Sequence, residues 1–367
     1  MNLDDMVDEA LQAKEAKKAV SQWYNLRPIL GYANWAIFYI LLGGREVGKS
    51  YSVTNFFVHQ WKTKGIPFTW LRLTETAARK LLANNAEKLC DPDLRRKYDL
   101  DLVTSGNNVY EVTERSKPDK TGKTKILEKK LMARVYALST FYNDKGSIFD
   151  NQFLDDPNMR YNVAIDEFER ESSSEKNNFD LLYACVNQLE NLLRSTKERT
   201  KIFFLGNTLT EASEILCAFN FIPEDWGIYK LKSKRCVIHN IAPSDAYLQR
   251  RKGTIADILM PNASTFTNKI DTDTALINKK QLHAPSYIIK FTKDKKDWFT
   301  VWDSNIVCKY NGEKKPVIAM RPYLDEVFST DIQKNTILLF DTRSLQFRNL
   351  ITFKQFQGCM ELLKPRK

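Results

Sequence analysis

The sequence contains few cysteines and histidines and no long apolar segment. Its six cysteines stand apart without a Cys-x-x-Cys pair, and its three histidines are far from one another. These spacings exclude a zinc cage and a disulfide framework, and they are typical of reduced thiols in a cytosol. The longest apolar run, from Trp35 to Leu42, has eight residues and is too short to span a membrane. The acidic start, MNLDDMVDEA, lacks the apolar region of a secretory signal, so we expect neither secretion nor a membrane partner.

The chain is long, basic and rich enough in apolar residues to build a large core. It has 367 residues, of which 43% are hydrophobic and 12% aromatic, and this composition excludes global disorder. A chain of this length favours two domains over one. The 56 lysines and arginines exceed the 45 aspartates and glutamates, which gives a net charge of +11. That charge fits a polyanionic partner and a well-solvated surface equally well.

The first 90 residues predict a helix followed by alternating strands and helices. Apolar residues at helical spacing among charges indicate a helix over 1–30. The apolar run WAIFYILL, residues 35–42, has no polar face and is typical of a buried strand in a parallel sheet. The α/β alternation continues with a helix over 50–62, a strand over 65–73 and a helix over 75–89.

A polar, turn-rich segment interrupts this pattern at residues 105–130, SGNNVYEVTERSKPDKTGKTKILEKK. Its lysines cluster between 117 and 130. The composition indicates a β-hairpin or a mobile insertion at the edge of the sheet. The lysines could contact nucleic acid, and a solvated loop is the alternative.

The sheet resumes further along the chain, and a second domain follows it. Strands are predicted over 132–139, 161–168 and 201–208, with a helix over 179–194, so the fold class is α/β with a mainly parallel sheet. After Pro285, the segments SYIIKF, WFTVWD, VIAM and TILLF indicate short strands of a small β-rich domain. The predicted organisation is an N-terminal domain over 1–242, a linker or lid over 243–283, and a C-terminal domain over 284–367.

The segment GGREVGKS, residues 43–50, matches the phosphate-binding pattern G-x-x-x-x-G-K-[S/T] between a strand and a helix. The glycines let successive backbone N–H groups point at a phosphate. Lys49 would place its charge on the β- and γ-phosphates, and the Ser50 hydroxyl would ligate Mg²⁺. A glycine-rich turn with a surface lysine is the alternative. The predicted ATP-binding residues are Gly43, Gly44, Arg45, Glu46, Val47, Gly48, Lys49, Ser50 and Tyr51.

Polar residues end the next two predicted strands of the sheet. The strand YNVAIDEF ends in Asp166 and Glu167, and ligands bind at the carboxyl edge of open parallel sheets. Asp166 is predicted to hold Mg²⁺, and Glu167 to polarise the attacking water as general base. The adjacent pair favours an NTP hydrolase over a kinase. Asn207, which ends the strand IFFLGN, could orient the water, sense the γ-phosphate or simply form a turn.

Several basic residues are candidates for stabilising the transferred phosphate. Arg45 lies inside the phosphate loop, and the segment NLLRSTKERTK supplies Arg194 and Arg199 just before the strand that ends in Asn207. In ring ATPases an arginine of the neighbouring subunit completes the site, and Arg194 is the first choice for this role. Lys145 is a weaker candidate for a contact in trans. A basic helix end that is favoured by the helix dipole is the alternative.

Together these motifs resemble those of the viral DNA-packaging ATPases. GGREVGKS with an arginine four residues before its lysine, NVAIDEF, and IFFLGN after a basic segment carry the resemblance over residues 35–210. The segment LSTFYNDKGS, residues 138–147, is also similar to this family. The resemblance is greatest to the large-terminase-like motors of small tailed podophages with protein-primed linear genomes.

The resemblance implies a P-loop core of the additional-strand, catalytic-glutamate type and an ATPase that uses ATP and Mg²⁺ to translocate double-stranded DNA. It also implies a homomeric ring, usually a pentamer, that docks on the capsid portal in the host cytoplasm together with a structural packaging RNA. By position, Arg45 corresponds to the loop arginine and Asn207 to the coupling residue. Arg194 corresponds to the trans-acting arginine only if one residue is inserted.

In many terminases the C-terminal domain is an RNase H-like nuclease whose carboxylates hold metal ions. The candidates here are Asp303, Asp325 or Glu326, and Asp341 after the predicted strand ILLF, at a spacing that matches poorly. We therefore expect a vestigial, non-cleaving domain that contacts DNA or RNA through its lysines. The alternative functions are a helicase or cellular ring translocase, a terminase with an active nuclease, and an NTP-gated switch.

Overall fold

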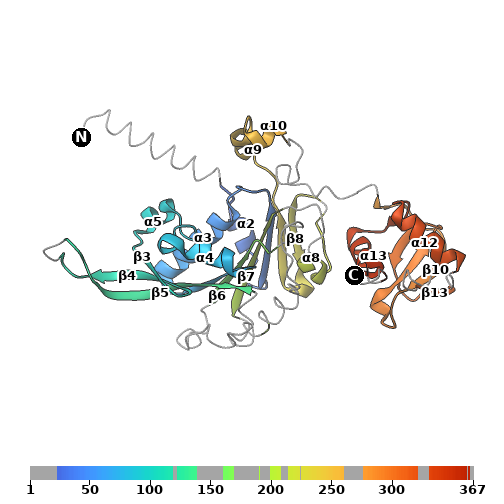
Figure 1. Ribbon diagram of the computed structural model, residues 1–367, viewed down its shortest axis with the longest axis horizontal. Helices are drawn as coiled ribbons and strands as arrows, with labels where there is room; N and C mark the ends of the chain where they lie inside the picture. Colours follow the sequence, from blue (N-terminus) through green and yellow to red (C-terminus); the bar gives the residue numbers. More distant parts are fainter. Residues whose placement is uncertain are drawn as a thin grey trace. The chain divides into compact units, whose positions relative to one another are not determined.

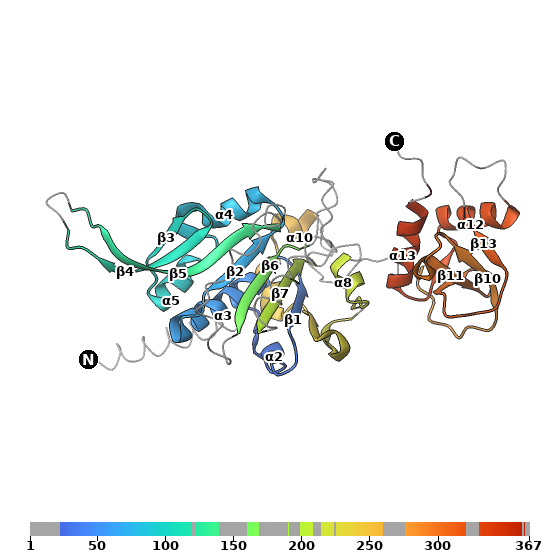
Figure 2. The same ribbon diagram turned by 90° about the horizontal axis from the view of Figure 1, so that it is seen from below.

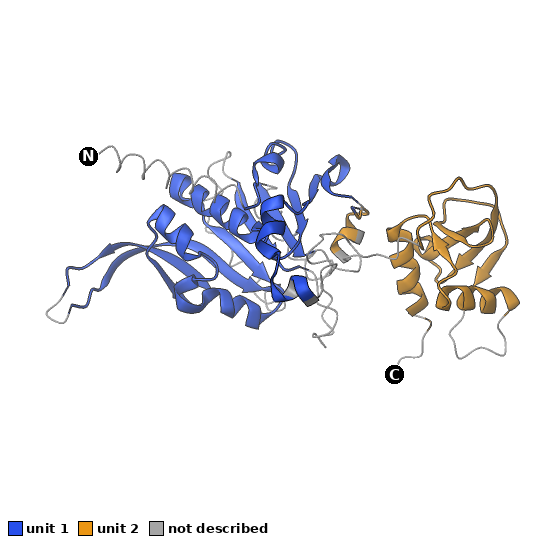
Figure 3. Ribbon diagram, turned by 90° about the horizontal axis from the view of Figure 1, so that it is seen from above, with its two compact units in different colours: residues 1–209, 223–270 blue, residues 210–222, 271–367 orange. Residues whose placement is uncertain are grey.

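The computed structural model describes residues 23–118, 122–138, 160–168, 190, 199–207, 214–223, 225–259, 276–320, 330–361 and 363. The chain divides into two compact units (Figure 3). Unit 1 comprises residues 1–209 and 223–270, and unit 2 comprises residues 210–222 and 271–367. The domain boundaries at 242 and 283 stay a prediction.

A nine-stranded sheet forms the centre of unit 1, in the order β3-β4-β5-β2-β6-β7-β1-β9-β8 (Figure 1). From β5 to β9 in this order the strands run parallel, and β3, β4 and β8 are antiparallel to their neighbours. The fold is therefore the predicted α/β class with a mainly parallel sheet. The strands are β1 (Phe38–Gly43), β2 (Phe68–Arg72), β3 (Leu102–Ser105), β4 (Asn108–Arg115), β5 (Ile126–Ala137), β6 (Tyr161–Asp166), β7 (Thr200–Asn207), β8 (Gly227–Leu231) and β9 (Cys236–Asn240).

The strand that carries Asp166 does not pair with the strand that precedes the phosphate loop. Instead β7 lies between β6 and β1 and pairs in parallel with both. A strand inserted at this place defines the additional-strand class, which confirms that prediction. In the register, Gly43 is opposite Asn207, and Asp166 is opposite Leu205. The ends of the three strands that bear the motifs therefore meet at one edge of the sheet.

The helices after β1 and β2 pack on one face of this sheet. Helix α3 (Lys49–Lys64) buries Phe57, whose ring centroid lies 6.1 Å from that of Trp70 on β2 and 5.4 Å from that of Phe203 on β7. Full burial of such a side chain contributes about 1.5–3 kcal/mol. This packing fixes the start of α3 against the carboxyl edge of the sheet. The other helices here are α2 (Arg27–Leu30), α4 (Glu75–Ala86) and α5 (Pro92–Tyr98).

The predicted helix over 1–30 is confirmed at residues 27–30 and is wrong at residues 23–26. Residues 23–26 are not helical, and α2 begins at Arg27 with Pro28 in its first turn. Proline lacks an N–H and fits the first turn of a helix, so Pro28 lies where this helix starts. The Tyr24 N–H donates to the Val47 carbonyl at 3.0 Å, and this bond ties the segment to the phosphate loop. Residues 1–22 of the predicted helix lie outside the described residues.

A hairpin at the sheet edge accounts for the polar segment 105–130. Strands β4 and β5 pair in antiparallel fashion, and β3 completes this side of the sheet (Figure 2). The predicted β-hairpin is therefore confirmed over its described residues. The linker predicted over 243–283 contains the short helices α9 (Asp245–Arg251) and α10 (Ile255–Leu259), and residues 260–275 lie outside the described part.

Lys201 on β7 is a partly buried cation at the amino end of the strand, with its ammonium group 5.5 Å from the Phe56 ring centroid. Burial, together with the charges of Arg160 and Lys64, lowers its pKa to about 8. The charged form is thus disfavoured in the folded state, so the stability of the protein should rise as the pH increases from about 8 toward the pKa of about 10.4 in the unfolded chain.

We therefore expect Lys201→Met to stabilise unit 1 by about 1–2 kcal/mol at neutral pH, because no charge is then buried. The benefit should shrink as the pH rises above about 8 and vanish above the pKa of about 10.4 in the unfolded chain, where Lys201 is neutral in both states. Thermal unfolding followed by circular dichroism at neutral pH and at this higher pH tests this, with Lys234→Met on an exposed turn as the control. An equal benefit at both pH values would contradict the electrostatic origin.

Unit 2 contains a five-stranded sheet in the order β13-β10-β11-β12-β14, as the predicted small β domain requires. Phe356 on α13 is fully buried and packs against Phe299 of the sheet, with ring centroids 5.2 Å apart. The elements are α8 (Glu214–Ala218), β10 (Pro285–Lys290), β11 (Trp298–Trp302), β12 (Ile306–Lys309), β13 (Val317–Ala319), α12 (Asp331–Asp341), β14 (Gln346–Phe347) and α13 (Leu350–Glu361).

The predicted strand TILLF is wrong, because residues 336–340 lie within helix α12. A capping box begins this helix: the Thr330 hydroxyl accepts from the Gln333 N–H, and the Gln333 side chain accepts from the Thr330 N–H. A short apolar run does not distinguish strand from helix, and the Thr-x-x-Gln signal upstream decides it. Asp341 therefore ends a helix and does not follow a strand.

Candidate nucleotide site

The phosphate loop connects β1 to α3 and contains two residues with left-handed backbone. Glu46 has φ of 65° and Gly48 has φ of 94°. A Cβ on Gly48 would lie 2.8 Å from Cε3 of Trp23, so this position requires glycine both for its backbone and for space. The N-terminus of α3 then points its first N–H groups into the loop, which is the arrangement that binds phosphates.

Lys49 is buried and lies across the mouth of this loop. Its Nζ donates to the carbonyls of Gly43 and Gly44, both at 2.8 Å, and to Oδ1 of Asn207 at 3.4 Å. The ammonium group is thus bound by one carbonyl of β1, one carbonyl of the loop and the side-chain oxygen at the end of β7. The predicted loop lysine and the predicted strand-end asparagine lie together.

Ser50 and Asp166 also lie together, although they are far apart in sequence. The Ser50 hydroxyl donates to Oδ1 of Asp166 at 3.2 Å. A hydroxyl and a carboxylate oxygen in this position form an oxygen donor set of the kind that Mg²⁺ prefers. The residues present therefore fit the predicted metal ion.

Glu167 follows the end of β6 in a left-handed conformation, with φ of 53°. Its side chain is 58% exposed, whereas Asp166 is buried. The next residue, Phe168, is fully buried, and its ring packs so closely on Gly206 that a Cβ there would lie 2.7 Å from the ring. Phe168 therefore anchors the turn that presents the Glu167 carboxylate at the carboxyl edge.

Arg72, at the end of β2, was not predicted from the sequence as a site residue. Its guanidinium contacts both acidic residues. Its Nη1 donates to Oδ2 of Asp166 at 2.8 Å, and its Nη2 donates to Oε2 of Glu167. The Arg72 and Asp166 side chains are 14% and 9% exposed, so their attraction is screened less than that of a surface salt bridge. The available signal was a charged residue that ends an apolar strand at the same sheet edge.

The predicted basic residues differ in where the structure puts them. Arg45 is exposed on the phosphate loop. Arg199 immediately precedes β7, whereas Asn207 ends it, so Arg199 lies roughly 20–25 Å from the loop of its own chain. It cannot contact a phosphate bound there. Arg194 and Lys145 lie outside the described residues.

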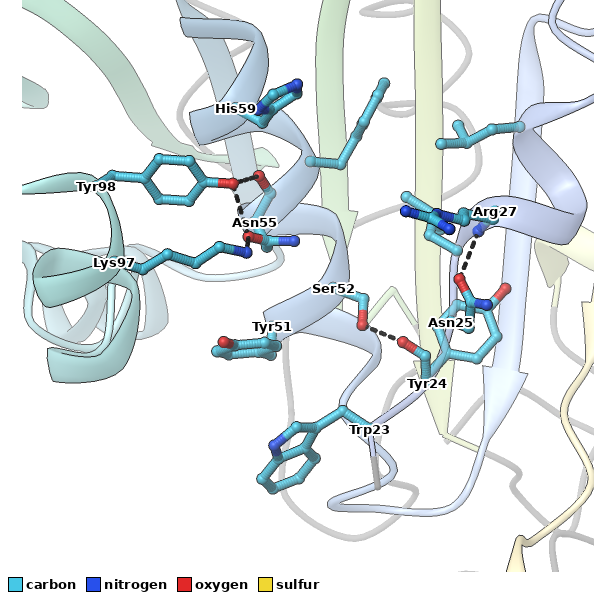
Figure 4. Close-up of a pocket in the computed structure, with 13 residues that line it drawn as sticks. Trp23, Tyr24, Asn25, Arg27, Tyr51, Ser52, Asn55, His59, Lys97 and Tyr98 are labelled. Atoms are coloured by element: carbon cyan, nitrogen blue, oxygen red, sulfur yellow. Dashed lines mark hydrogen bonds between the residues drawn. The ribbon is translucent and has the colours of Figure 1, made fainter. Parts of the chain in front are cut away.

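A cavity of about 810 Å³ runs along α3 beside the phosphate loop (Figure 4). At its loop end the rings of Trp23 and Tyr51 lie 6.0 Å apart, and the Arg250 guanidinium covers Trp23 at 4.5 Å from a ring centroid. Tyr51 also lines a smaller cavity together with Ser50 and Asp166. The predicted binding residue Tyr51 thus lies between the acidic edge and the larger cavity.

The carboxylates proposed for a nuclease do not form a cluster in the part of unit 2 that the structure describes. Asp303 lies in the turn after β11 and accepts from the backbone N–H groups of His283 and Ala284, which lower its pKa. Asp341 ends helix α12, and residues 325 and 326 lie outside the described part. Within the described ranges, no group of three or more His, Cys, Asp or Glu residues could hold a metal ion.

No protein-family model matches the chain, and no curated protein sequence matches it. Several solved structures do match the chain. A chain of the bacteriophage phi29 viral genome packaging motor assembly is 18% identical, with a TM-score of 0.61 over 93% of this chain and 99% of that one. This chain has the fold of a phage DNA packaging motor. The phi28 DNA packaging motor is 15% identical, with a TM-score of 0.53 over 93% of this chain and 97% of that one. The packaging-motor fold thus extends over both units.

In the described part of this packaging-motor fold, no helix is long and apolar enough to cross a membrane.

Proposed function

We propose that this chain is an ATPase that drives double-stranded DNA into a viral capsid. The observation that carries the proposal is the 3.2 Å hydrogen bond from the Ser50 hydroxyl to Asp166, at the edge where Lys49 and Glu167 also lie. It unites a phosphate loop with an acidic strand end, as nucleotide hydrolysis requires. The whole-chain likeness to genome packaging motors then directs the choice among P-loop ATPases.

Each residue of the edge has a proposed role. The loop 43–51 binds the nucleotide, and the Lys49 ammonium group pairs with its terminal phosphates. Ser50 and Asp166 would hold Mg²⁺, which neutralises phosphate charge when it is bound. Glu167 accepts a proton from the attacking water.

Further groups would adjust this chemistry. Asn207, hydrogen-bonded to Lys49, is proposed to report the state of the terminal phosphate to β7. Arg72 pairs with Glu167, so this carboxylate must leave Arg72 before it can orient water freely.

Arg45 is proposed to stabilise the transferred phosphate in its own site. Arg194 is proposed to do so in the site of a neighbouring subunit, with Arg199 and Lys145 as further candidates.

We further propose the assembly that such a motor needs. A homomeric ring, a pentamer by analogy, would dock on the capsid portal in the host cytoplasm with a structural packaging RNA. The β-rich domain would be a vestigial nuclease that touches DNA or RNA through its lysines, because a protein-primed genome has unit length and needs no cutting.

Duplex DNA should stimulate the ATPase rate several-fold, and single-stranded DNA or RNA should stimulate it less. The reason is that a packaging motor hydrolyses ATP productively when its track is engaged. A coupled assay of phosphate release with each nucleic acid measures this. Preference for single strands would favour a helicase, and a rate insensitive to every nucleic acid would contradict a translocase. Mg²⁺-dependent nicking of a supercoiled plasmid would instead favour a terminase with an active nuclease.

A further inference from the structure

The β4–β5 hairpin continues beyond the sheet as a two-stranded ribbon, which comprises residues 113–118 and 122–130. In Figures 1 and 2 it extends away from the helices of unit 1. Every residue of the ribbon is exposed except Ser116, which is partly buried. Within the part of the chain that the structure describes, neither a third strand nor a helix covers it, and an isolated two-stranded ribbon gains little stability of its own. Its length therefore calls for an explanation other than the core of unit 1.

The root of the ribbon is fixed firmly. The buried Glu111 carboxylate accepts from Trp61 Nε1 at 2.6 Å and from Lys62 Nζ at 2.5 Å, both on α3. The Arg115 guanidinium binds the Asp101 carboxylate in a bidentate manner, at 2.5 and 2.9 Å. These contacts set the direction in which the ribbon leaves the sheet, so it is a directed arm and not a loose loop.

The ribbon carries an excess of positive charge. Its described acidic residues are Glu114 and Glu128, and they are outnumbered by Arg115, Lys117, Lys123, Lys125, Lys129 and Lys130. Arg115 is paired with Asp101, and Nζ of Lys130 lies 3.7 Å from Oε1 of Glu128. Among the described residues, Lys117 and Lys125 have no carboxylate partner. An exposed surface of this sign attracts the phosphates of a nucleic acid.

The shape of the ribbon selects duplex DNA as the partner. Paired strands lie about 4.8 Å apart, and the major groove of B-form DNA, about 12 Å wide, admits a two-stranded ribbon. The major groove of A-form RNA is too narrow and deep for such an arm. Lysines on a ribbon in the groove reach phosphates on both sides without reading bases, which suits a motor that must grip any sequence.

We propose that the β4–β5 ribbon is a DNA-gripping arm that lies in the major groove and contacts backbone phosphates through Lys117, Lys123 and Lys125. This inference rests on the proposed function and names the part of the chain that meets its DNA. The simplest competing explanation is that lysines on exposed strands only prevent edge-to-edge aggregation. Reversing their charge separates the two explanations, because glutamate also protects an edge but repels phosphate.

The experiment compares the full-length protein with Lys117→Glu/Lys123→Glu/Lys125→Glu and with the control Lys80→Glu/Lys232→Glu/Lys234→Glu, which changes the net charge equally at exposed positions outside the ribbon. Fluorescence anisotropy with a labelled 30-base-pair duplex gives the affinity at several salt concentrations. We expect the ribbon variant to lose at least about tenfold in affinity and to lower the salt slope by roughly 2–3, as for three lost phosphate contacts. Arginines at the same three positions should preserve binding.

Equal losses in the ribbon and control variants would overturn the inference, since net charge alone would then explain binding. A loss confined to structured RNA would overturn it as well. Unchanged melting temperatures of the variants exclude misfolding as the cause. If duplex DNA stimulates the ATPase rate of the wild type but the ribbon variant binds DNA with normal affinity, only the gripping arm is refuted. If duplex DNA does not stimulate the ATPase rate of the wild type, the proposed function is refuted.

Discussion

Glu167→Gln should bind ATP normally and hydrolyse it about 10²–10⁴-fold more slowly, because a general base contributes a factor of that size. The substitution is conservative in this site. The amide oxygen of the new side chain can still accept from Arg72 Nη2, as the Glu167 carboxylate does now, and the left-handed backbone at this position does not change. Only the capacity to accept a proton from water is lost. Single-turnover hydrolysis and nucleotide affinity, measured on the same preparation, check both halves of this expectation.

Glu87→Gln is a matched control, since the Glu87 carboxylate is exposed and accepts from the nearby Asn84 side chain. It should leave both quantities unchanged. Hydrolysis at the wild-type rate by Glu167→Gln would show that the base lies elsewhere. Reduced ATP affinity in the same variant would show instead that Glu167 contributes to binding.

The parallel core of the fold could be predicted because its strands are buried on both faces. WAIFYILL, YNVAID and KIFFLGN are mainly apolar segments, and most of each lies in a central strand, β1, β6 and β7 respectively. Strands with mixed patterns were harder to predict. β8 and β9 at the far edge, Gly227–Leu231 and Cys236–Asn240, include the charged turn 232–234 between them and were not predicted. Alternation over five residues with a lysine and a histidine is a weak signal.

Residues of the nucleotide site could be predicted where their chemistry follows from a local sequence pattern. Lys49 and Ser50 belong to a loop whose spacing has a mechanical reason, and Asp166 and Glu167 directly end an apolar strand. Arg72 also ends an apolar strand, but its role comes from the pairing of β2 with β6, which brings its guanidinium to both carboxylates. Strand order is a tertiary property, and the sequence contains no local record of it.

The same limit explains why the trans-acting residue stays a prediction. Arg199 is ruled out for its own phosphate loop by its position at the opposite end of β7 from Asn207. Whether a basic side chain reaches a neighbouring site depends on packing between subunits, which neither residue spacing nor a single chain encodes. The assignment of Arg194 as the trans-acting residue therefore rests on the resemblance of the sequence to the family.

Lys49→Met should weaken ATP binding by roughly 10–200-fold, which corresponds to the loss of a charged hydrogen bond worth about 1.5–3 kcal/mol. Methionine keeps the long unbranched stem that fills the buried space at the start of α3, so the loop should keep its shape. The carbonyls of Gly43 and Gly44, which accept from the ammonium group at 2.8 Å, then lose this donor. Titration with a fluorescent ATP analogue measures the change, and Lys80→Met on the exposed face of α4 is the control.

The two variants are expected to fail in opposite ways, and this opposition tests the site more sharply than either loss of activity. Glu167→Gln should form a stable ATP complex that does not turn over, whereas Lys49→Met should bind poorly at any concentration near the wild-type Kd. Because Lys49 also contacts Asn207 on β7, Asn207→Ala should reproduce neither defect fully: the ammonium group keeps its two carbonyl partners at 2.8 Å. Unchanged affinity in Lys49→Met would mean that the loop carbonyls hold this lysine for structure alone, and the assignment of the phosphate loop would then be wrong.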